Sequence, residues 1–487
     1  MDLNHKYIFK MMGTLMIFIG ISMFPSILMA LLYKEPPALK AFAATAVFSI
    51  IIGIFLAKMI RAGQKRLKVR DGYLIVASCW LLASVIGSVP YMLSGEIPNF
   101  IDAFFETTSG FSTTGASILT DVENVSRSVL FWRAFTQWLG GMGILVFAVA
   151  ILPSLGIGGN VIVKAEAPGP MLEKVAPKIS DSAKILYIMY TSFTLLEIVL
   201  LLICGMNFYD SLVHTFASIS TGGFSAYNDS IAHFDSVYID TIVLIFMFIG
   251  GISFNLYYLV IRHGFCEFLH DSELKLYTLI LVVSALLIGI NLHLSGIFSS
   301  ASGALRHSAF QAVSIMTTTG FVTDNYDLWP TFSKMILLAL MLIGGCSASA
   351  AGGIKVIRIL MIYKLIGRGI YLRLHPKAVV SIRIRDKAIP ADIVSKVASF
   401  VFLYVAIIFV SSILISLDSL DMMSGISAVI SCIGNIGSGF GASGPMIHYS
   451  TFSYASKGLL SVLMLIGRLE LFTLLMLFVP GFWNPNR

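Results

Sequence analysis

Long apolar runs alternate with short polar segments along almost the whole chain. About 20 apolar residues are enough for a helix to cross the hydrocarbon core of a membrane. About ten stretches meet this condition, near 7–33, 38–60, 72–94, 128–154, 183–207, 234–262, 274–297, 331–364, 391–416 and 451–480. The first has no small-residue cleavage site, so we interpret it as a retained helix and not as a signal peptide.

Four shorter, half-apolar stretches lie between these spans, at 101–117, 209–225, 306–322 and 423–440. Each is too short to cross a membrane, and such segments between spans are candidates for re-entrant helices. In ungapped alignment they read DAFFETTSGFSTTG, DSLVHTFASISTGG, HSAFQAVSIMTTTG and SGISAVISCIGNIG. The long helix after each carries a shared mark: LGGMG, IGGIS, IGGCS and IGRLE. The sequence therefore predicts a unit of helix, re-entrant helix, glycine loop and helix, repeated four times in one orientation.

This repeat defines the expected fold class, an all-α polytopic membrane protein with four parallel pseudo-repeats around one pore. Residues 1–70 would form an N-terminal helix pair with a basic loop. The four repeats would occupy residues 71–165, 166–270, 271–375 and 376–487.

Composition excludes several other classes of protein. Of the 487 residues, 57% are hydrophobic and only 12% are charged, which rules out an ordinary soluble domain and a disordered chain. The formal charge of +7 does not indicate nucleic-acid binding, because the basic residues gather in short loops between spans, chiefly 58–70 and 364–387. Such loops are typical of the cytoplasmic side. The five cysteines form no CxxC pair, so neither a disulfide framework nor a zinc site is predicted.

The four glycine loops are the candidate functional site. Irregular backbone at membrane depth is tolerated only where it is buried in protein or lines an aqueous cavity. Four equivalent loops meet this condition by converging on one axis, where their carbonyl oxygens can replace the hydration shell of a cation. Glycine suits such loops because it adopts backbone angles that a Cβ disfavours. The predicted filter residues are Thr113, Thr114, Gly115, Thr221, Gly222, Gly223, Thr318, Thr319, Gly320, Asn435, Ile436 and Gly437. Between the two glycines of the second loop, repeat register favours Gly223.

The third repeat contains a run of small residues that weakens its last helix. The run comprises Gly344, Gly345, Cys346, Ser347, Ala348, Ser349, Ala350, Ala351, Gly352 and Gly353. Two interpretations stay open: a close helix crossing, or an intramembrane loop that lies across the conduction path below the filter.

Arg468 occupies the place where the other repeats carry Gly141, Gly251 and Gly345. A cation at membrane depth is costly and should face a cavity or a partner. It could form a structural ion pair with Glu470 or another carboxylate. Alternatively, it could place a fixed positive charge on the axis, where it would repel cations and help to hold the loop shut.

Other buried polar residues are interpreted as structural. Glu106 and Arg133 could pair in the first repeat, where structural support is favoured over ion binding. His214 and His307 are expected to be hydrogen-bonded packing residues and not metal ligands. Glu197, within an apolar span, has no role that the sequence explains.

The chain closely resembles the bacterial Trk-type potassium-uptake membrane subunit, of the superfamily that also contains Ktr and plant HKT transporters. The resemblance covers essentially the whole chain, and its most specific motifs are FWRAFTQWLGGMGILVFAVAILP, EAPGP, FIGGISFN, IGGCSASAAGGIKVIRIL and IGRLELFTLL. It maps the family's four filter glycines onto Gly115, Gly223, Gly320 and Gly437, and a glycine at the first position implies preference for potassium over sodium. It also implies that residues 344–353 form the intramembrane gate.

The resemblance further implies a homodimer in the bacterial inner membrane and a peripheral cytosolic regulatory subunit with nucleotide-binding domains. Membrane lipids are the other expected partner of the basic loop. No cofactor is expected, and the potassium ion is the transported substrate.

The sequence bears on three rival functions. A nucleotide-driven pump is disfavoured because no GxxxxGK[ST] run is present. An enzyme is disfavoured because neither HExxH nor GxSxG occurs. A secondary symporter that couples potassium to protons or sodium is the remaining alternative, since such transporters use broken helices and a buried carboxylate. Four breaks in one orientation favour channel-like conduction.

Overall fold

The computed structural model describes residues 4–59, 68–143, 179–384 and 387–483. Helices make up most of these residues. A short antiparallel hairpin, β1 (Arg383–Ile384) and β2 (Lys387–Ala388), lies beyond α17 (Val356–Leu374). Residues 144–154 of the predicted span 128–154 and the EAPGP motif lie outside the described residues.

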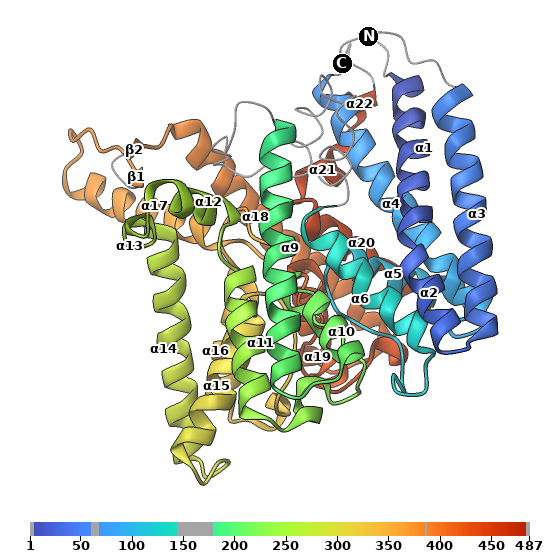
Figure 1. Cartoon of the computed structure of the whole chain (residues 1–487). Helices are drawn as coiled ribbons and strands as arrows, with labels where there is room; N and C mark the ends of the chain where they lie inside the picture. Colours follow the sequence, from blue (N-terminus) through green and yellow to red (C-terminus); the bar gives the residue numbers. More distant parts are fainter. Residues whose placement is uncertain (1–3, 60–67, 144–178, 385–386, 484–487) are drawn as a thin grey trace.

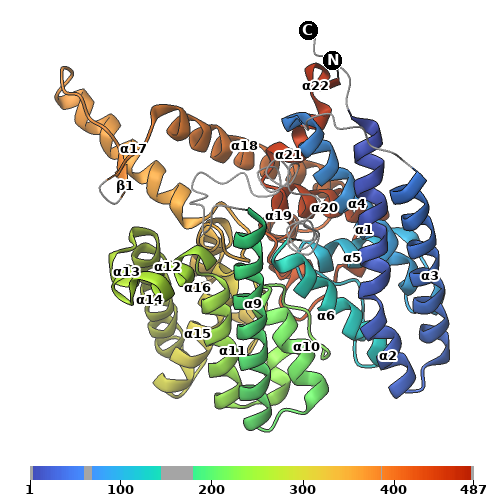
Figure 2. The ribbon, with the colours of Figure 1, turned by 45° about the horizontal axis from the view of Figure 1, so that its top comes forward.

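An N-terminal layer is formed by α1 (His5–Ser22), α2 (Phe24–Leu32) and α3 (Pro36–Met59). Gly13 and Gly53 let α1 and α3 approach closely, since a Cβ on Gly53 would lie 2.6 Å from the carbonyl oxygen of Gly13. Small residues at helix contacts in membranes commonly serve this purpose. Figures 1 and 2 place α1 and α3 at one side of the bundle and α14 at the other.

A long helix, a short helix and a further helix then follow one another four times. The first set is α4 (Val69–Ser94), α5 (Phe100–Phe111) and α6 (Arg127–Gly141). The second is α9 (Ile179–Ile203), α10 (Phe208–Ile219) and α11 (Val237–Gly250), continued by α12 (Phe254–His263) and α13 (Cys266–His270). The third is α14 (Ser272–Leu294), α15 (Ala301–Met316) and α16 (Thr331–Ile343), continued by α17. The fourth is α18 (Ala391–Ile415), α19 (Met422–Gly434) and α20 (Tyr454–Arg468), continued by α21 (Phe472–Leu475) and α22 (Pro480–Trp483).

Short 3-10 helices lie in the segments that connect the α-helices. They are η2 (Ser230–Phe234), η3 (Tyr326–Leu328), η4 (Ser416–Asp418), η5 (Gly441–Ser443), η6 (Tyr449–Thr451) and η7 (Met476–Phe478).

The long helices agree with most of the predicted spans. Within the described ranges, six helices are long and apolar enough to cross a membrane, or eight if each of two bent pairs counts as one span. The prediction of continuous spans over 234–262, 331–364 and 451–480 was wrong. The first and third bend by 87° and 113°, and the second stops at Ile343. In the third case Glu470 and Leu471 adopt positive φ angles of 55° and 58°, which no helix accommodates.

The four short helices are the segments predicted to be re-entrant. They contain 12, 12, 16 and 13 residues and therefore cannot cross a membrane of ~30 Å at ~1.5 Å per residue. Each is preceded by an N-cap residue whose side chain accepts a hydrogen bond from a backbone N–H of the first turn: Asn99, Asn207, Ser300 and Asp421. Such N-caps fix where each helix starts, and hence where its other end lies.

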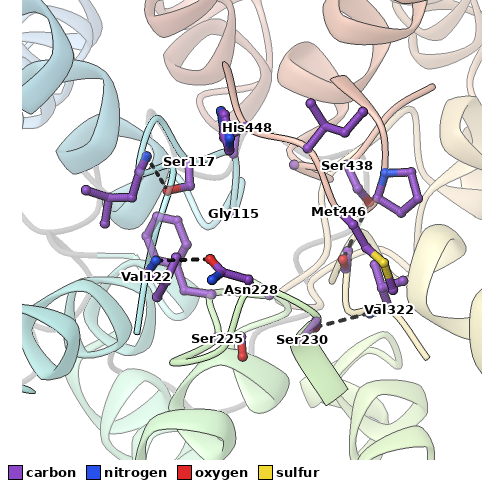
Figure 3. Close-up of a pocket in the computed structure, with 18 of the residues that line it drawn as sticks. Gly115, Ser117, Val122, Ser225, Asn228, Ser230, Val322, Ser438, Met446 and His448 are labelled. Atoms are coloured by element: carbon purple, nitrogen blue, oxygen red, sulfur yellow. Dashed lines mark hydrogen bonds between the residues drawn. The ribbon is translucent and has the colours of Figure 1, made fainter. Parts of the chain in front are cut away.

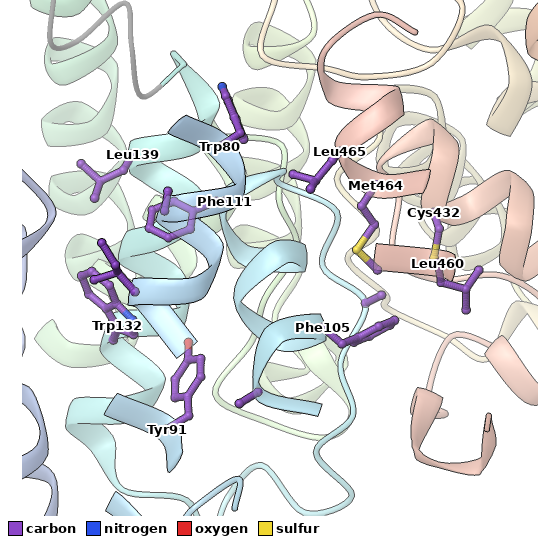
Figure 4. Close-up of a cluster of buried hydrophobic side chains, with 14 of the residues drawn as sticks. Trp80, Tyr91, Phe105, Phe111, Trp132, Leu139, Cys432, Leu460, Met464 and Leu465 are labelled. Atoms are coloured by element: carbon purple, nitrogen blue, oxygen red, sulfur yellow. The ribbon is translucent and has the colours of Figure 1, made fainter. Parts of the chain in front are cut away.

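An aromatic core anchors the first short helix. Phe111 at the end of α5 meets Trp132 of α6 edge-on, with ring centroids 6.2 Å apart. The Trp132 indole N–H donates to the carbonyl oxygen of Gly87 in α4 at 3.2 Å. On the other side of α5, Phe105 packs against Tyr449, 5.5 Å away, toward the pair α19–α20 (Figure 4). The helix is thus held by large, well-packed side chains on both sides.

Candidate functional site

The four glycine loops share one backbone conformation. One or two positions after the end of each short helix comes a residue with positive φ, namely Thr113 (56°), Thr221 (56°), Thr318 (58°) and Asn435 (56°). Two residues later comes a glycine with positive φ: Gly115 (81°), Gly223 (77°), Gly320 (80°) and Gly437 (90°). Gly222 is not among the positive-φ residues, so Gly223 is the structural equivalent of the other three, in agreement with repeat register.

Equivalent hydrogen bonds close each loop onto its helix. Each bond runs from a backbone N–H to a backbone carbonyl oxygen, at 2.7 to 2.9 Å. The donor and acceptor pairs are Thr114 and Ser109, Gly222 and Ala217, Thr319 and Ser314, and Ile436 and Ser431. Because this pattern recurs in every copy, the four loops present the same peptide groups in the same order.

The loops meet in a closed ring. A Cβ added to Gly115 would collide with the carbonyl oxygen of Gly222, one on Gly223 with that of Thr319, one on Gly320 with that of Ile436, and one on Gly437 with that of Thr114. Each loop therefore touches the next, and the fourth returns to the first. Only glycine allows carbonyl groups of neighbouring loops to crowd together in this way.

An open vestibule of about 170 Å³ lies on one side of this ring. All four glycines line it, together with residues that follow them in the chain, including Ser117, Ser225, Asn228, Ser438 and His448 (Figure 3). Two hydrogen bonds tie its walls together. The Val122 N–H donates to the Asn228 side chain at 3.0 Å, and the Val322 N–H donates to the Ser230 hydroxyl at 3.2 Å. The vestibule is thus built from the loops of different repeats.

Side chains behind the ring fix the loops. Gln137 of α6 donates from its side-chain amide to the Gly222 carbonyl at 2.6 Å and accepts from the Phe224 N–H at 3.0 Å. Asn435 donates to the Thr114 hydroxyl at 3.0 Å and to the Met464 carbonyl at 2.9 Å. Gln137 therefore braces the second loop, and Asn435 links the fourth loop to the first.

Glu106 and Arg133 form the predicted ion pair, at 2.7 Å, with side chains 0% and 2% exposed. The Glu106 carboxylate also accepts from the Ser117 hydroxyl and the Ile118 N–H, both at 2.9 Å. Arg133 further donates to the Ser225 carbonyl of the second loop at 3.4 Å. A buried pair with its remaining hydrogen bonds satisfied has the geometry of a structural support for two filter loops.

Residues 344–353 form a loop and not a helix crossing. The Gly352 N–H donates to the Thr318 hydroxyl at 2.8 Å, and a Cβ on Gly352 would meet the carbonyl of Gly434 and the side chain of Asn435. These partners precede the ring glycines in the chain, whereas the vestibule residues follow them. The loop therefore covers the face of the ring opposite the vestibule.

Arg468 contacts this loop directly. Its guanidinium donates to the Ala350 carbonyl at 2.6 Å, and to the carbonyls of Gly140 and Gly141 at 2.6 and 2.8 Å. Arg468 thus fastens the loop to the end of α6. Glu470, which was one candidate partner, forms an ion pair with Arg358.

The paired glycines of the marked helices have a packing role. A Cβ on Gly140 would strike the carbonyl of Phe111, and one on Gly467 would strike that of Ile433. These carbonyls lie at the ends of α5 and α19. The LGG mark of the first repeat and the IGR mark of the fourth therefore let α6 and α20 each lie against the end of a short helix.

The structure also gives the hydrogen-bond partners of His214, His307 and Glu197. His214 bonds the Asp210 carbonyl at 2.8 Å and the Ser225 hydroxyl at 3.0 Å, and His307 bonds the Thr323 hydroxyl at 3.1 Å. Glu197 is fully buried and accepts from the Ser218 hydroxyl of the second short helix. Its contact partner could not be read from the sequence, because α9 and α10 meet only in the folded chain.

Glu273 is a site residue that sequence reasoning missed. It lies in the first turn of α14, and its carboxylate binds the loop 344–353 through Ser347. In the sequence it looks like an ordinary acidic residue at a helix start, where negative charge is favoured.

A closed ring of peptide carbonyls within a bundle of apolar helices, open on one face and covered on the other, defines a membrane ion-transport protein. Residues 38–484 match the family model described as "TrkH: Cation transport protein". The chain is 37% identical over 486 residues to the Trk system potassium uptake protein TrkH of Escherichia coli K12, covering 99% of this chain and 100% of that protein. It is 32% identical to the Trk system potassium uptake protein TrkG of the same strain, covering 99% and 100%.

Similarity extends to a solved structure. The crystal structure of the potassium transporter TrkH from Vibrio parahaemolyticus matches with a TM-score of 0.89 and 34% identity, over 99% of this chain and 100% of that chain. The chain belongs to the TrkH family of cation transport proteins. It is a multi-pass inner-membrane transporter and not an enzyme.

Proposed function

We propose that this protein takes up potassium ions by channel-like conduction through the ring of four glycine loops. The observation that carries the proposal is the closed circle of loop contacts, in which Gly115, Gly223, Gly320 and Gly437 each meet a carbonyl of the neighbouring loop. Carbonyl oxygens crowded around one axis can replace the water shell of a cation. The relatives' names, potassium uptake proteins, support potassium as the ion.

The filter comprises Thr113–Gly115, Thr221–Gly223, Thr318–Gly320 and Asn435–Gly437, and potassium occupies it only in transit. The short helices point their C-terminal ends toward it, where the partial negative charge of a helix favours a cation. A glycine at position 115 leaves the first of the four loops, which form the quadrants of the ring, without a side chain. This suits potassium, which is larger than sodium. No resident cofactor takes part in this function.

The loop 344–353 acts as the gate, and Arg468 holds it closed. The guanidinium contacts both the loop and the end of α6, so it adds a fixed positive charge on the side of the ring that the loop covers. Such a charge repels a permeating cation in a low-dielectric surrounding. Opening requires the loop to move away from the ring.

Control comes from the cytoplasmic side in this proposal. The basic segment 364–387 and α17 are suited to meet anionic lipid and a peripheral nucleotide-binding regulatory subunit. The transporter acts as a homodimer, and its chain is divided at the repeat boundaries 71–165, 166–270, 271–375 and 376–487.

One observation favours the alternative, a potassium symporter coupled to protons or sodium. Glu197 is a fully buried carboxyl group, and none of the described residues donates a hydrogen bond to its second oxygen. Buried carboxyl groups in membranes often carry protons in coupled transporters.

Recordings from purified protein in planar bilayers separate the two functions. Channel-like conduction predicts discrete current steps whose reversal potential follows the potassium gradient and ignores a proton gradient. A potassium flux that stops without a proton or sodium gradient would establish the symporter instead. Glu197→Gln should leave conduction through a channel intact and abolish coupling in a symporter.

A further inference from the structure

One buried carboxylate holds both the gate loop and the helix that follows it. The Oε1 atom of Glu273 accepts from the backbone N–H of Ser347 at 2.6 Å and from that of Ile357 at 3.1 Å. Its Oε2 atom accepts from the Ser347 hydroxyl at 2.6 Å. Ser347 lies within the loop, whereas Ile357 lies just after it, so a single side chain fixes the loop at two points.

The contact with Ile357 also supplies a cap to the helix that follows the loop. Ile357 is in the first turn of α17, whose N-cap residue, Lys355, makes no side-chain hydrogen bond to that turn. The first N–H groups of a helix need acceptors, and a carboxylate is favoured there by the helix dipole. Glu273 provides this acceptor from another helix.

The carboxylate depends on the closed loop as much as the loop depends on it. Glu273 is only 8% exposed, and a buried charge is costly unless donors surround it. Two of its three donor groups belong to Ser347. Movement of the loop away from the ring would remove those donors, so loop position and the environment of Glu273 are coupled.

The segment α12–α13 is joined to the loop at both of its ends. At its start, the Phe254 N–H donates to the Ala348 carbonyl at 3.1 Å. At its end, Asp271 caps α14 through the Leu274 N–H at 2.7 Å, and Glu273 follows two residues later. A displacement of this segment would therefore act on two adjacent residues of the loop together.

We propose that Glu273 is a latch: a positioning residue that keeps the loop 344–353 across the ring and ties its opening to the position of α12–α13. The proposal rests on the gate role given to this loop above. It assigns Glu273 no contact with the permeating ion, so the latch sets how often the path is open and not which ion passes.

Potassium flux into proteoliposomes, with the potassium-to-sodium flux ratio measured beside it, tests the latch. Glu273→Ala should raise potassium flux about tenfold, the change expected from losing one charge-assisted hydrogen bond in the closed state. Glu273→Gln keeps the shape without the charge and should give a smaller rise. Ser347→Ala should also give a smaller rise, and combining it with Glu273→Ala should add nothing further. The flux ratio should stay at the wild-type value in every variant.

Asp392→Asn is the matched control, since it removes an exposed carboxylate that pairs with Lys396 at the start of α18. It should leave flux unchanged. Unchanged or reduced flux in folded Glu273→Ala protein, while wild-type protein conducts, would overturn the latch. If Glu273→Ala does not fold, the same result in Ser347→Ala protein overturns it. Absence of potassium conduction in the wild-type protein would instead overturn the proposed function.

Discussion

The Thr318 hydroxyl accepts a hydrogen bond of 2.8 Å from the backbone N–H of Gly352. This bond joins a residue of the third glycine loop to the segment that covers the ring. Because Gly352 also lies against Asn435 of the fourth loop, the cover is seated on two quadrants of the ring. Movement of the loop 344–353 must therefore change the surroundings of the ring, so the loop and the ring are structurally coupled.

Arg468→Ala should raise cation flux, because it removes both a positive charge and the hydrogen bonds that fasten Ala350 to the end of α6. We expect a rise of about tenfold, corresponding to ~1.4 kcal/mol less stabilisation of the closed loop. Tracer potassium uptake into proteoliposomes measures it. Lys40→Ala, which removes an exposed positive charge from α3, should change nothing. Unchanged or lower flux in well-folded Arg468→Ala protein would refute the barrier role.

Gly115→Ser should weaken discrimination against sodium. A Cβ at this position would strike the Gly222 carbonyl, and its φ of 81° disfavours a side chain, so the first quadrant must shift. We expect the potassium-to-sodium flux ratio to fall about tenfold, equivalent to ~1.4 kcal/mol of selectivity. Gly458→Ser in α20, where a Cβ meets nothing within 4 Å, is the control. An unaltered ratio would show that this loop does not select ions.

Glu106→Gln and Arg133→Ala should each destabilise the protein strongly. Removing one partner leaves the other charge buried and unpaired, which costs ~3–5 kcal/mol. Thermal unfolding in detergent should show a lower Tm for each single variant. The double variant Glu106→Gln/Arg133→Ala should lose less than the sum of the two. Additive losses would mean that the pair does not act as a unit.

Acid should destabilise the fourth repeat through Asp421. Its hydrogen bonds with Ser424, at the start of α19, lower the pKa of this carboxyl group. A lowered pKa in the folded state gives stability that is complete above the unfolded pKa of about 3.9 and is lost as pH falls through the folded value. Tm measured between pH 7 and pH 3 should fall less steeply for Asp421→Asn than for wild type. If Tm falls equally steeply with pH in wild type and in Asp421→Asn, the Asp421 carboxylate does not contribute to this loss of stability.

The fourfold repeat could be predicted because each copy carries a recognisable pattern of residues within a short stretch of sequence. Each copy ends in small polar residues and a glycine, and these have to reach a backbone region that side chains disfavour, as at Gly223 and Gly437. Hydropathy likewise predicted the six long helices, since a membrane imposes length and apolar character directly.

The breaks in the other helices depend on contacts that sequence does not display. The chain turns after α20 at Glu470 and Leu471, two residues with positive φ that are ordinary helix formers by propensity. A Cβ added to Gly250 would lie 3.1 Å from the carbonyl oxygen of Ile219, but only the folded chain brings α10 and α11 together there. Glu273 escaped notice for the same reason, because its partner Ser347 is 74 residues away.

The ring is drawn from one polypeptide, so its four quadrants are free to differ. In an assembly of four identical subunits, any substitution is multiplied around the axis and alters every quadrant at once. Here a codon change reaches a single quadrant, and Asn435 and Ile436 already stand where the first loop has threonines. A substitution can therefore alter one loop of such a ring during evolution while the other three loops keep their sequence.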